Sequence, residues 1–156
     1  MDIKSLPDQL EGIVIKKVDH IGIAVKSIDE TLNKWKALFG IEAQHIETVK
    51  EHFVRVAFIS IGGVLIEMLE PSEPGAGVIA EFLEKHGEGF NHIAYRVRGL
   101  ETLLAEMKKK GISLSPIYHK DWRPLLGSRS SLIAFINQEE TNNVLIELIE
   151  MKDESA

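Results

Sequence analysis

The chain writes the same pattern twice, and this repeat constrains its fold more than any other feature. Three pairs of segments match: VDHIGIAV (18–25) with FNHIAYRV (90–97), VAFISI (56–61) with IAFINQ (133–138), and VLIEMLE (64–70) with VLIELIE (144–150). Each copy reads as a β-run, a helical stretch and three further strands. The sequence therefore predicts two βαβββ modules in tandem.

Local signals place the elements within each copy. Apolar spacing predicts helices at about 28–39 and 99–110, and a short helix at 78–86 between the copies. Gly62-Gly63 and Asn142-Asn143 occupy matching places before the last strand, and both tolerate the positive φ of a tight turn. We divide the chain into an N-terminal arm (1–16), a first module (17–71), a linker (72–89), a second module (90–151) and a C-terminal tail (152–156).

Two such modules, each with a helix on one side of its strands, predict an α+β fold. The strands would form a curved, incompletely closed barrel. One face of each sheet packs on its helix, and the other face lines a concavity. In 18–25, strand periodicity assigns Ile21, Ile23 and Val25 to the helix side and His20 and Gly22 to the concave side.

Four polar residues occupy matched places on strands that are otherwise apolar. His20 and His92 lie on the first strand of each copy, and Glu67 and Glu147 lie on the last. A buried carboxylate costs several kcal/mol unless it is paired or bound to metal. A single histidine or glutamate of this kind is more often a hydrogen-bonded or solvated residue. Because the pair recurs in both copies, we predict that the four side chains bind one divalent metal and leave positions open for water or substrate.

Composition excludes several classes of function. The net charge of −6 argues against a nucleic-acid partner, and no apolar run is long enough to cross a membrane. The chain has no cysteine, so disulfides and thiolate metal sites are ruled out, and a reducing cytoplasm is the expected location. Any metal ligand must be histidine, a carboxylate, an amide or water.

Across roughly residues 16–151 the chain resembles the vicinal oxygen chelate superfamily, which includes the glyoxalases and bleomycin resistance proteins. Within the superfamily it is most similar to the methylmalonyl-CoA epimerases. The resemblance is carried by VDHIGIAV (18–25), VRVAFISIGG (54–63), IEMLEP (66–71), IAEFLEKHGEGFNHIAYRV (79–97) and NNVLIELIE (142–150). The linker stretch EKHGEGFNHIA is the most specific part.

The resemblance implies a glyoxalase-like fold and a metal-dependent isomerase, with His20, Glu67, His92 and Glu147 as the metal ligands. The metal would be Zn, Co, Ni or Mn. The implied reaction inverts the carbon between the thioester and the carboxylate of a 2-substituted malonyl-CoA, and Glu147, then Glu67, are the expected proton-transfer residues. A homodimer is expected on the same ground.

The chain departs from the family in three places. Asn91 stands where the family often has a second histidine before the ligand. A further carboxylate proposed as a base in one family member would fall near Val54–Val56, where there is no acid. In place of a short Gly-rich turn, the second copy has a basic insertion, SPIYHKDWRPLLGSRSS (115–131). Its candidate substrate-binding residues are His119, Lys120, Trp122, Arg123 and Arg129. The insertion is either a solvated loop or a lid for an anionic acyl-CoA.

Two other functions remain open from the sequence. One is another metal-dependent enzyme of the superfamily, above all a glyoxalase I-like lyase acting on a hemithioacetal, which would use the same type of ligand set and the same enolate chemistry. The other is a non-catalytic binding module of the superfamily, which would often lack the metal ligands.

Overall fold

The computed structural model describes residues 14–116, 118–122 and 129–152, and for residues 14, 118–122 and 129–130 it describes the backbone alone. The chain divides into two compact units, and we describe each by itself. One unit is His20–His92, and the other joins the residues before it to those from Ile93 onward. Most of the predicted N-terminal arm lies outside the described residues, and the domain bounds given above stay a prediction.

The element order confirms the doubled pattern. The first copy comprises β1 (Val14–Ala24), α1 (Ile28–Phe39), β2 (His45–Val49), β3 (Val54–Ile61) and β4 (Val64–Pro71), with a short 3-10 turn at Lys50–His52. The second copy comprises β5 (Gly89–Arg98), α3 (Leu100–Lys109), β6 (Tyr118–Trp122), β7 (Arg129–Ile136) and β8 (Leu145–Met151), with a 3-10 turn at Gln138–Glu140. The linker helix is α2 (Gly77–His86). Each copy is therefore a βαβββ module.

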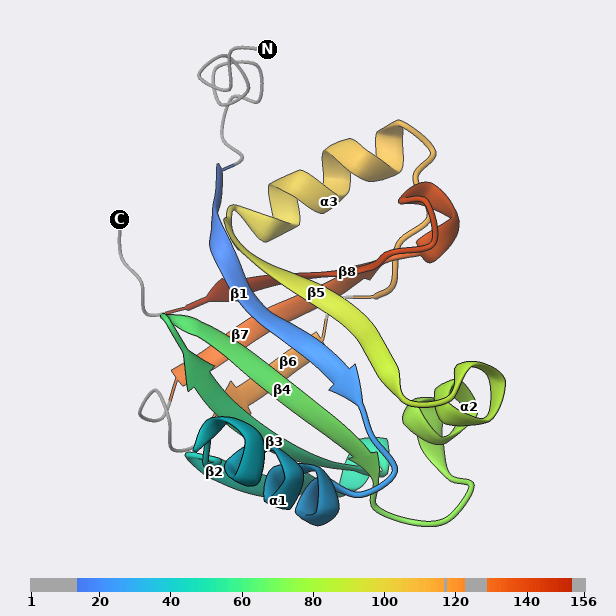
Figure 1. The fold of residues 1–156 in the computed structure, drawn as a ribbon. Coiled ribbons are helices and arrows are strands. Elements are labelled where there is room, and N and C mark those ends of the chain that lie inside the picture. Colours follow the sequence, from blue (N-terminus) through green and yellow to red (C-terminus); the bar gives the residue numbers. More distant parts are fainter. Residues whose placement is uncertain (1–13, 117, 123–128, 153–156) are drawn as a thin grey trace. The chain divides into compact units, whose positions relative to one another are not determined.

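In the His20–His92 unit the strands lie in the order β2-β3-β4-β1. Strands β2, β3 and β4 are antiparallel neighbours, whereas β1 runs parallel to β4. A parallel neighbour needs a crossover connection, and α1 begins that connection. The helix lies across one face of the sheet (Figure 1).

Helix α1 begins and ends where the sequence predicts. The hydroxyl of Ser27 accepts a hydrogen bond from the backbone N–H of Glu30, and Gly40 closes the helix at φ 67°. The helix packs on a core that lies on one face of β1, β3 and β4. Its buried and partly buried members include Ile23, Val25, Ile28, Leu32, Trp35, Ala57, Ile59, Ile66 and Met68. The predicted helix side of β1 is thus confirmed.

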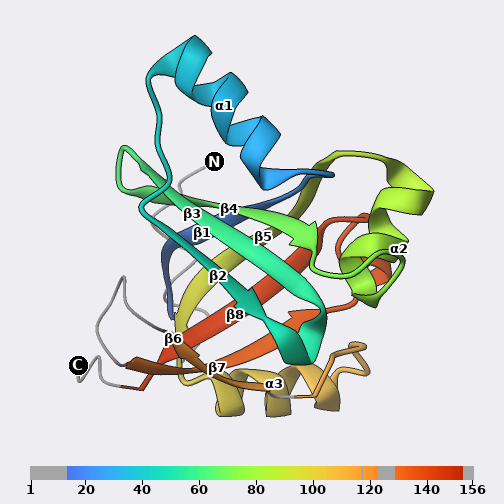
Figure 2. The same ribbon diagram turned by 90° about the horizontal axis from the view of Figure 1, so that it is seen from below.

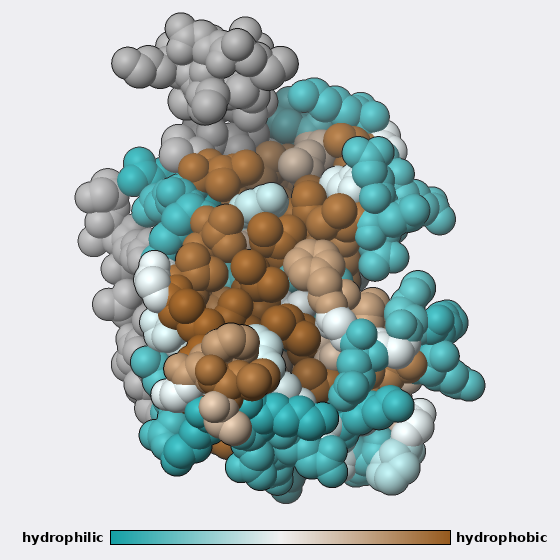
Figure 3. Space-filling model, viewed as in Figure 1, coloured by the Kyte–Doolittle hydropathy of each residue, from teal (hydrophilic) through white to brown (hydrophobic). Residues whose placement is uncertain are grey.

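The C-terminal end of α1 corrects the predicted apolar stripe. Leu38 and Phe39 continue the helical spacing of Leu32 and Trp35, which predicts that they pack in the core, but they are 71% and 65% exposed. Both lie in the last turn, where the ring of Phe39 meets that of Trp35 edge to face. Hydrophobic side chains also gather over β4 and the adjoining half of β1 (Figure 3), where Ile21 and Ile66 are half-buried. One helix therefore covers only part of this face.

The second unit has the corresponding strand order β5-β8-β7-β6. Helix α3 packs against this sheet (Figure 2), and Leu100, Leu103 and Leu104 are its buried side chains. They join a core formed with Val97, Leu132, Ala134, Ile136 and Leu148. Among the described residues, no helix is both long and apolar enough to cross a membrane.

The predicted insertion is partly regular structure. Residues 118–122 form β6, which pairs antiparallel with β7 in a register that sets Trp122 opposite Arg129. In strand order β6 takes the place in the second unit that β2 takes in the first. The expectation of a loop through 115–131 is therefore wrong for these residues, since they complete the second module.

The last glutamate of each of the repeated segments VLIEMLE (64–70) and VLIELIE (144–150) has a structural role. The carboxylate of Glu70 accepts a hydrogen bond from the backbone N–H of Ile28, at the start of α1. The carboxylate of Glu150 accepts from Gly99 N (2.6 Å) and Leu100 N (3.1 Å), at the start of α3. A carboxylate at a helix N-terminus satisfies free N–H groups and complements the helix dipole. One glutamate of each repeat is thus explained by helix capping, which leaves Glu67 and Glu147 to be explained.

Candidate metal centre

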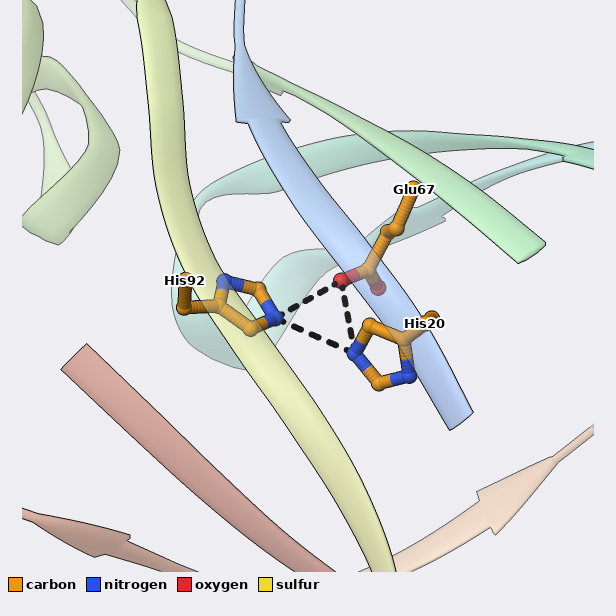
Figure 4. A group of neighbouring side chains, drawn as sticks. All are labelled: His20, Glu67 and His92. Atoms are coloured by element: carbon orange, nitrogen blue, oxygen red, sulfur yellow. Dashed lines mark hydrogen bonds and ion pairs between the residues drawn. The ribbon is translucent and has the colours of Figure 1, made fainter. Parts of the chain in front are cut away.

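His20, Glu67 and His92 bring their side chains together in the His20–His92 unit. They come from β1, β4 and the start of β5 and point toward one another (Figure 4). The two Nε2 atoms lie 3.1 Å apart, and Glu67 Oε2 lies 3.4 Å from each of them. The three residues are buried, with 1%, 4% and 4% exposure. Among the described residues, these three form the group of histidine and carboxylate side chains whose donor atoms lie close enough together to hold a metal ion.

The geometry of these three atoms fits a first-row divalent ion. Zinc binds imidazole nitrogen and carboxylate oxygen at about 2.0–2.2 Å, so two ligands at a tetrahedral angle lie about 3.4 Å apart. The observed separations of 3.1 and 3.4 Å match that value. The set of two nitrogen donors and one oxygen donor suits Zn, Co, Ni or Mn. The residues present therefore fit the metal that the resemblance implies.

A glycine makes room for one of the imidazoles. Gly22 lies two residues after His20 on β1 and pairs with Glu67 in the parallel β1–β4 register. A Cβ atom on Gly22 would lie 2.2 Å from Cε1 and 2.3 Å from Nδ1 of His92. Such distances are far below van der Waals contact, so the ring rests on the bare backbone of Gly22. The glycine of HIGIAV thus has a steric role at the site.

A second carboxylate, Glu47, lies on the same face of this sheet as Glu67, and the sequence analysis missed it. The registers align His45, Phe58 and Glu67 in one row across β2, β3 and β4. Directly paired residues share a face, and Glu47 shares it too because it lies two residues after His45. The ring of His45 stacks on Phe58, and its Nε2 lies 3.4 Å from Glu47 Oε2. Glu47 is half-buried.

The sequence pattern does not single out Glu47, whereas the strand registers do. The resemblance points to Val54–Val56 for a further acid, where the chain has none, and the structure assigns these residues to β3. Glu47 lies one strand earlier, in HIETV (45–49), where burial alternates along the strand: His45, Glu47 and Val49 are half-buried, and Ile46 and Thr48 are exposed. The polar His45 and Glu47 take inward positions and the apolar Ile46 takes an outward one, so hydrophobic alternation in the sequence does not identify this face.

Glu147, the fourth predicted ligand, belongs to the other unit. It lies on β8, is 5% exposed, and pairs with Phe135 across the β7–β8 register. Glu67 pairs with Phe58 in the same way in the first unit. The two carboxylates are therefore buried in equivalent positions of the two modules. That Glu147 joins the other three at one ion stays a prediction.

The structure leaves the predicted substrate-binding residues untested. His119, Lys120 and Trp122 are on β6, and Arg129 begins β7, with their backbones alone described. Arg123 lies outside the described residues.

Comparison with known proteins identifies the family. Residues 19–125 match the model of the glyoxalase/bleomycin resistance protein/dioxygenase superfamily. The chain belongs to this superfamily. The match includes three of the four predicted ligands, and the paired βαβββ modules are those of the glyoxalase-like α+β fold.

Relatives of this superfamily member include epimerases. The chain is 38% identical to the uncharacterized protein YqjC of Bacillus subtilis over 88% of its own length and 94% of that protein. It is 28% identical to the human mitochondrial methylmalonyl-CoA epimerase, over 90% of the chain and 78% of that enzyme. A structure of the Streptomyces coelicolor methylmalonyl-CoA epimerase in complex with 2-nitronate-propionyl-CoA superposes with a TM-score of 0.73, at 30% identity, covering 88% of this chain and 98% of that one.

Proposed function

We propose that this protein is a metal-dependent epimerase of a 2-substituted malonyl-CoA. The single observation that carries the proposal is the buried convergence of His20, Glu67 and His92. A binding module would not need three buried ligand groups at these separations. The similarity to methylmalonyl-CoA epimerases favours this reaction over others in the superfamily.

In the proposed site, His20, Glu67 and His92 hold the ion, and Glu147 supplies a fourth ligand. The repeat supports the fourth ligand, because Glu147 is buried on β8 at the position that Glu67 has on β4. A bound divalent ion would supply a Lewis acid for the negative charge that develops on the thioester oxygen. The face opposite α1 would supply the apolar surroundings, through residues such as Val56 and Phe58, which are buried.

Inversion at the α-carbon requires two proton-transfer groups. One carboxylate removes the α-proton from one side, and an acid returns a proton to the other side. Glu67 lies 3.4 Å from both imidazoles, which suits a ligand better than a free base. Glu47 faces the same side of the sheet beside His45 and is absent from the ligand group, so we propose it as one proton-transfer residue. Glu147 is the proposed second, and because it is also the proposed fourth ligand, it would have to loosen from the ion or act through a bound water.

The substrate is expected to be anionic. The insertion at 115–131 carries cationic and aromatic residues that suit a coenzyme A ester, namely His119, Lys120, Trp122, Arg123 and Arg129. We also expect a homodimer, by analogy with the family, and a cytoplasmic location, because the chain has no cysteine.

The deciding experiment follows α-proton exchange in D₂O by NMR. Methylmalonyl-CoA, ethylmalonyl-CoA and a glutathione hemithioacetal are each incubated with metal-loaded and chelated protein. The proposal predicts metal-dependent deuterium incorporation at the α-carbon of the malonyl-CoA esters. Turnover of the hemithioacetal alone would identify a glyoxalase I-like lyase, and exchange with none of them would favour a binding module.

A further inference from the structure

The amide of Asn91 contacts the imidazole of the next residue. Asn91 Oδ1 lies 2.9 Å from His92 Nδ1, and both side chains are buried. We propose that Asn91 is a positioning residue that holds His92 with its proton on Nδ1 and its Nε2 lone pair toward Glu67 and His20. The inference rests on the proposed metal site but not on the acyl-CoA reaction.

The hydrogen-bonding capacity of the two groups supports this assignment. An amide oxygen only accepts, so the contact is a hydrogen bond when Nδ1 carries the proton. A neutral imidazole has one N–H, and the other nitrogen is then a bare acceptor. His92 Nε2 is the atom that lies 3.4 Å from Glu67 Oε2 and 3.1 Å from His20 Nε2. Asn91 therefore selects the tautomer that a metal ligand needs.

Asn91 also determines which way the His92 ring is turned, because the ring is tightly packed against Gly22. Gly22 admits the ring face at distances that no Cβ could tolerate, so the ring is closely packed on that side. A half-turn about the Cβ–Cγ bond would keep this shape but exchange Nδ1 with Cδ2 and Nε2 with Cε1. The turned ring would present carbon to both Asn91 Oδ1 and Glu67. The amide oxygen of Asn91 thus distinguishes two orientations that packing alone leaves alike.

The test reads the tautomer and the metal affinity directly. Long-range ¹H–¹⁵N spectra of metal-free protein, under mildly alkaline conditions where imidazole is ordinarily neutral, should show His92 protonated at Nδ1. Asn91→Leu should weaken Co²⁺ binding by about 10- to 100-fold, the usual effect of removing an orienting partner. Asn91→Asp keeps the acceptor and should bind Co²⁺ within about threefold of the wild type. The exposed Asn33 provides a matched control, since Asn33→Leu makes the same chemical change away from the site.

Two results would overturn the proposal. One is a wild-type spectrum with the His92 proton on Nε2, which decides the matter even if Asn91→Leu does not fold. The other is a folded Asn91→Leu protein with wild-type Co²⁺ affinity. Exchange activity is measured separately, so a protein without epimerase activity that still shows the Asn91 effects would remove the proposed reaction and leave this inference standing.

Discussion

At the scale of single residues, Gly22 offers the sharpest test of the site's packing. Its backbone does not have positive φ, so alanine is permitted conformationally, but the added Cβ would meet the His92 ring at 2.2 Å. We predict that Gly22→Ala displaces this ligand and lowers Co²⁺ affinity by about 100-fold or more, since one ligand of the set is lost. Isothermal titration measures the affinity, and the thermal unfolding of metal-free protein serves as the control. Unchanged affinity in a folded variant would contradict the described packing.

Metal ligands and proton-transfer residues should respond differently to substitution. His92→Ala should abolish metal retention, because the ligand itself is removed. Glu147→Gln should keep some metal and lose turnover, and Glu47→Gln should keep wild-type metal content while losing about 10²- to 10⁴-fold in exchange rate. Metal content and α-proton exchange are measured on each variant. Unchanged turnover in either glutamine variant would remove that residue from proton transfer.

Site residues could be predicted from the sequence where both copies carry the same residue type at the matching position. His20, Glu67 and His92 stood out because each recurs in the other copy, and the structure brings these three together. Glu47 has no acidic counterpart that the repeat made visible. Strand register was needed to align it with Phe58 and Glu67, and register depends on hairpin geometry across β2, β3 and β4.

At the scale of elements, the repeated glutamates link strands to helices. Glu150 accepts two backbone N–H groups at the start of α3. Glu150→Ala should lower the free energy of unfolding by about 1–2 kcal/mol, as the loss of a helix cap does. Glu101→Ala, an exposed acidic position in the first turn of the same helix, is the control and should change the free energy less. Equal losses in urea unfolding would show that charge near the terminus, and not the two hydrogen bonds, is responsible.

Helices were predicted more accurately than the insertion. Capping residues and apolar spacing fix α1 locally, through Ser27 and Gly40. Strand β6 has no comparable local signal, since its three central residues are polar or charged and only Tyr118 and Trp122 favour a strand, so its conformation depends on pairing with β7. The exposure of Leu38 and Phe39 was equally hidden, because helical spacing does not reveal how far a sheet extends beneath a helix.

At the scale of the whole molecule, the doubled pattern accounts for the architecture of both units. The order of the strands repeats, as β2-β3-β4-β1 and β6-β7-β8-β5, and each sheet packs on one helix. The sequence predicted this βαβββ doubling because each copy carries its own helix and turn signals, including Gly62-Gly63 and Asn142-Asn143, all of which have positive φ. That Glu147 binds the same ion as the other three residues stays a prediction, which the repeat supports.

The central claim is that this fold binds one catalytic divalent ion through a matched set of histidines and glutamates. Titration of metal-free protein with Co²⁺, followed by visible absorption and by metal analysis after dialysis, tests it most directly. We predict one equivalent per chain, tightly bound, with the cobalt spectrum lost in His92→Ala and altered in Glu147→Gln. Absence of a stoichiometric ion in the wild type, or an unchanged spectrum in His92→Ala, would contradict the account.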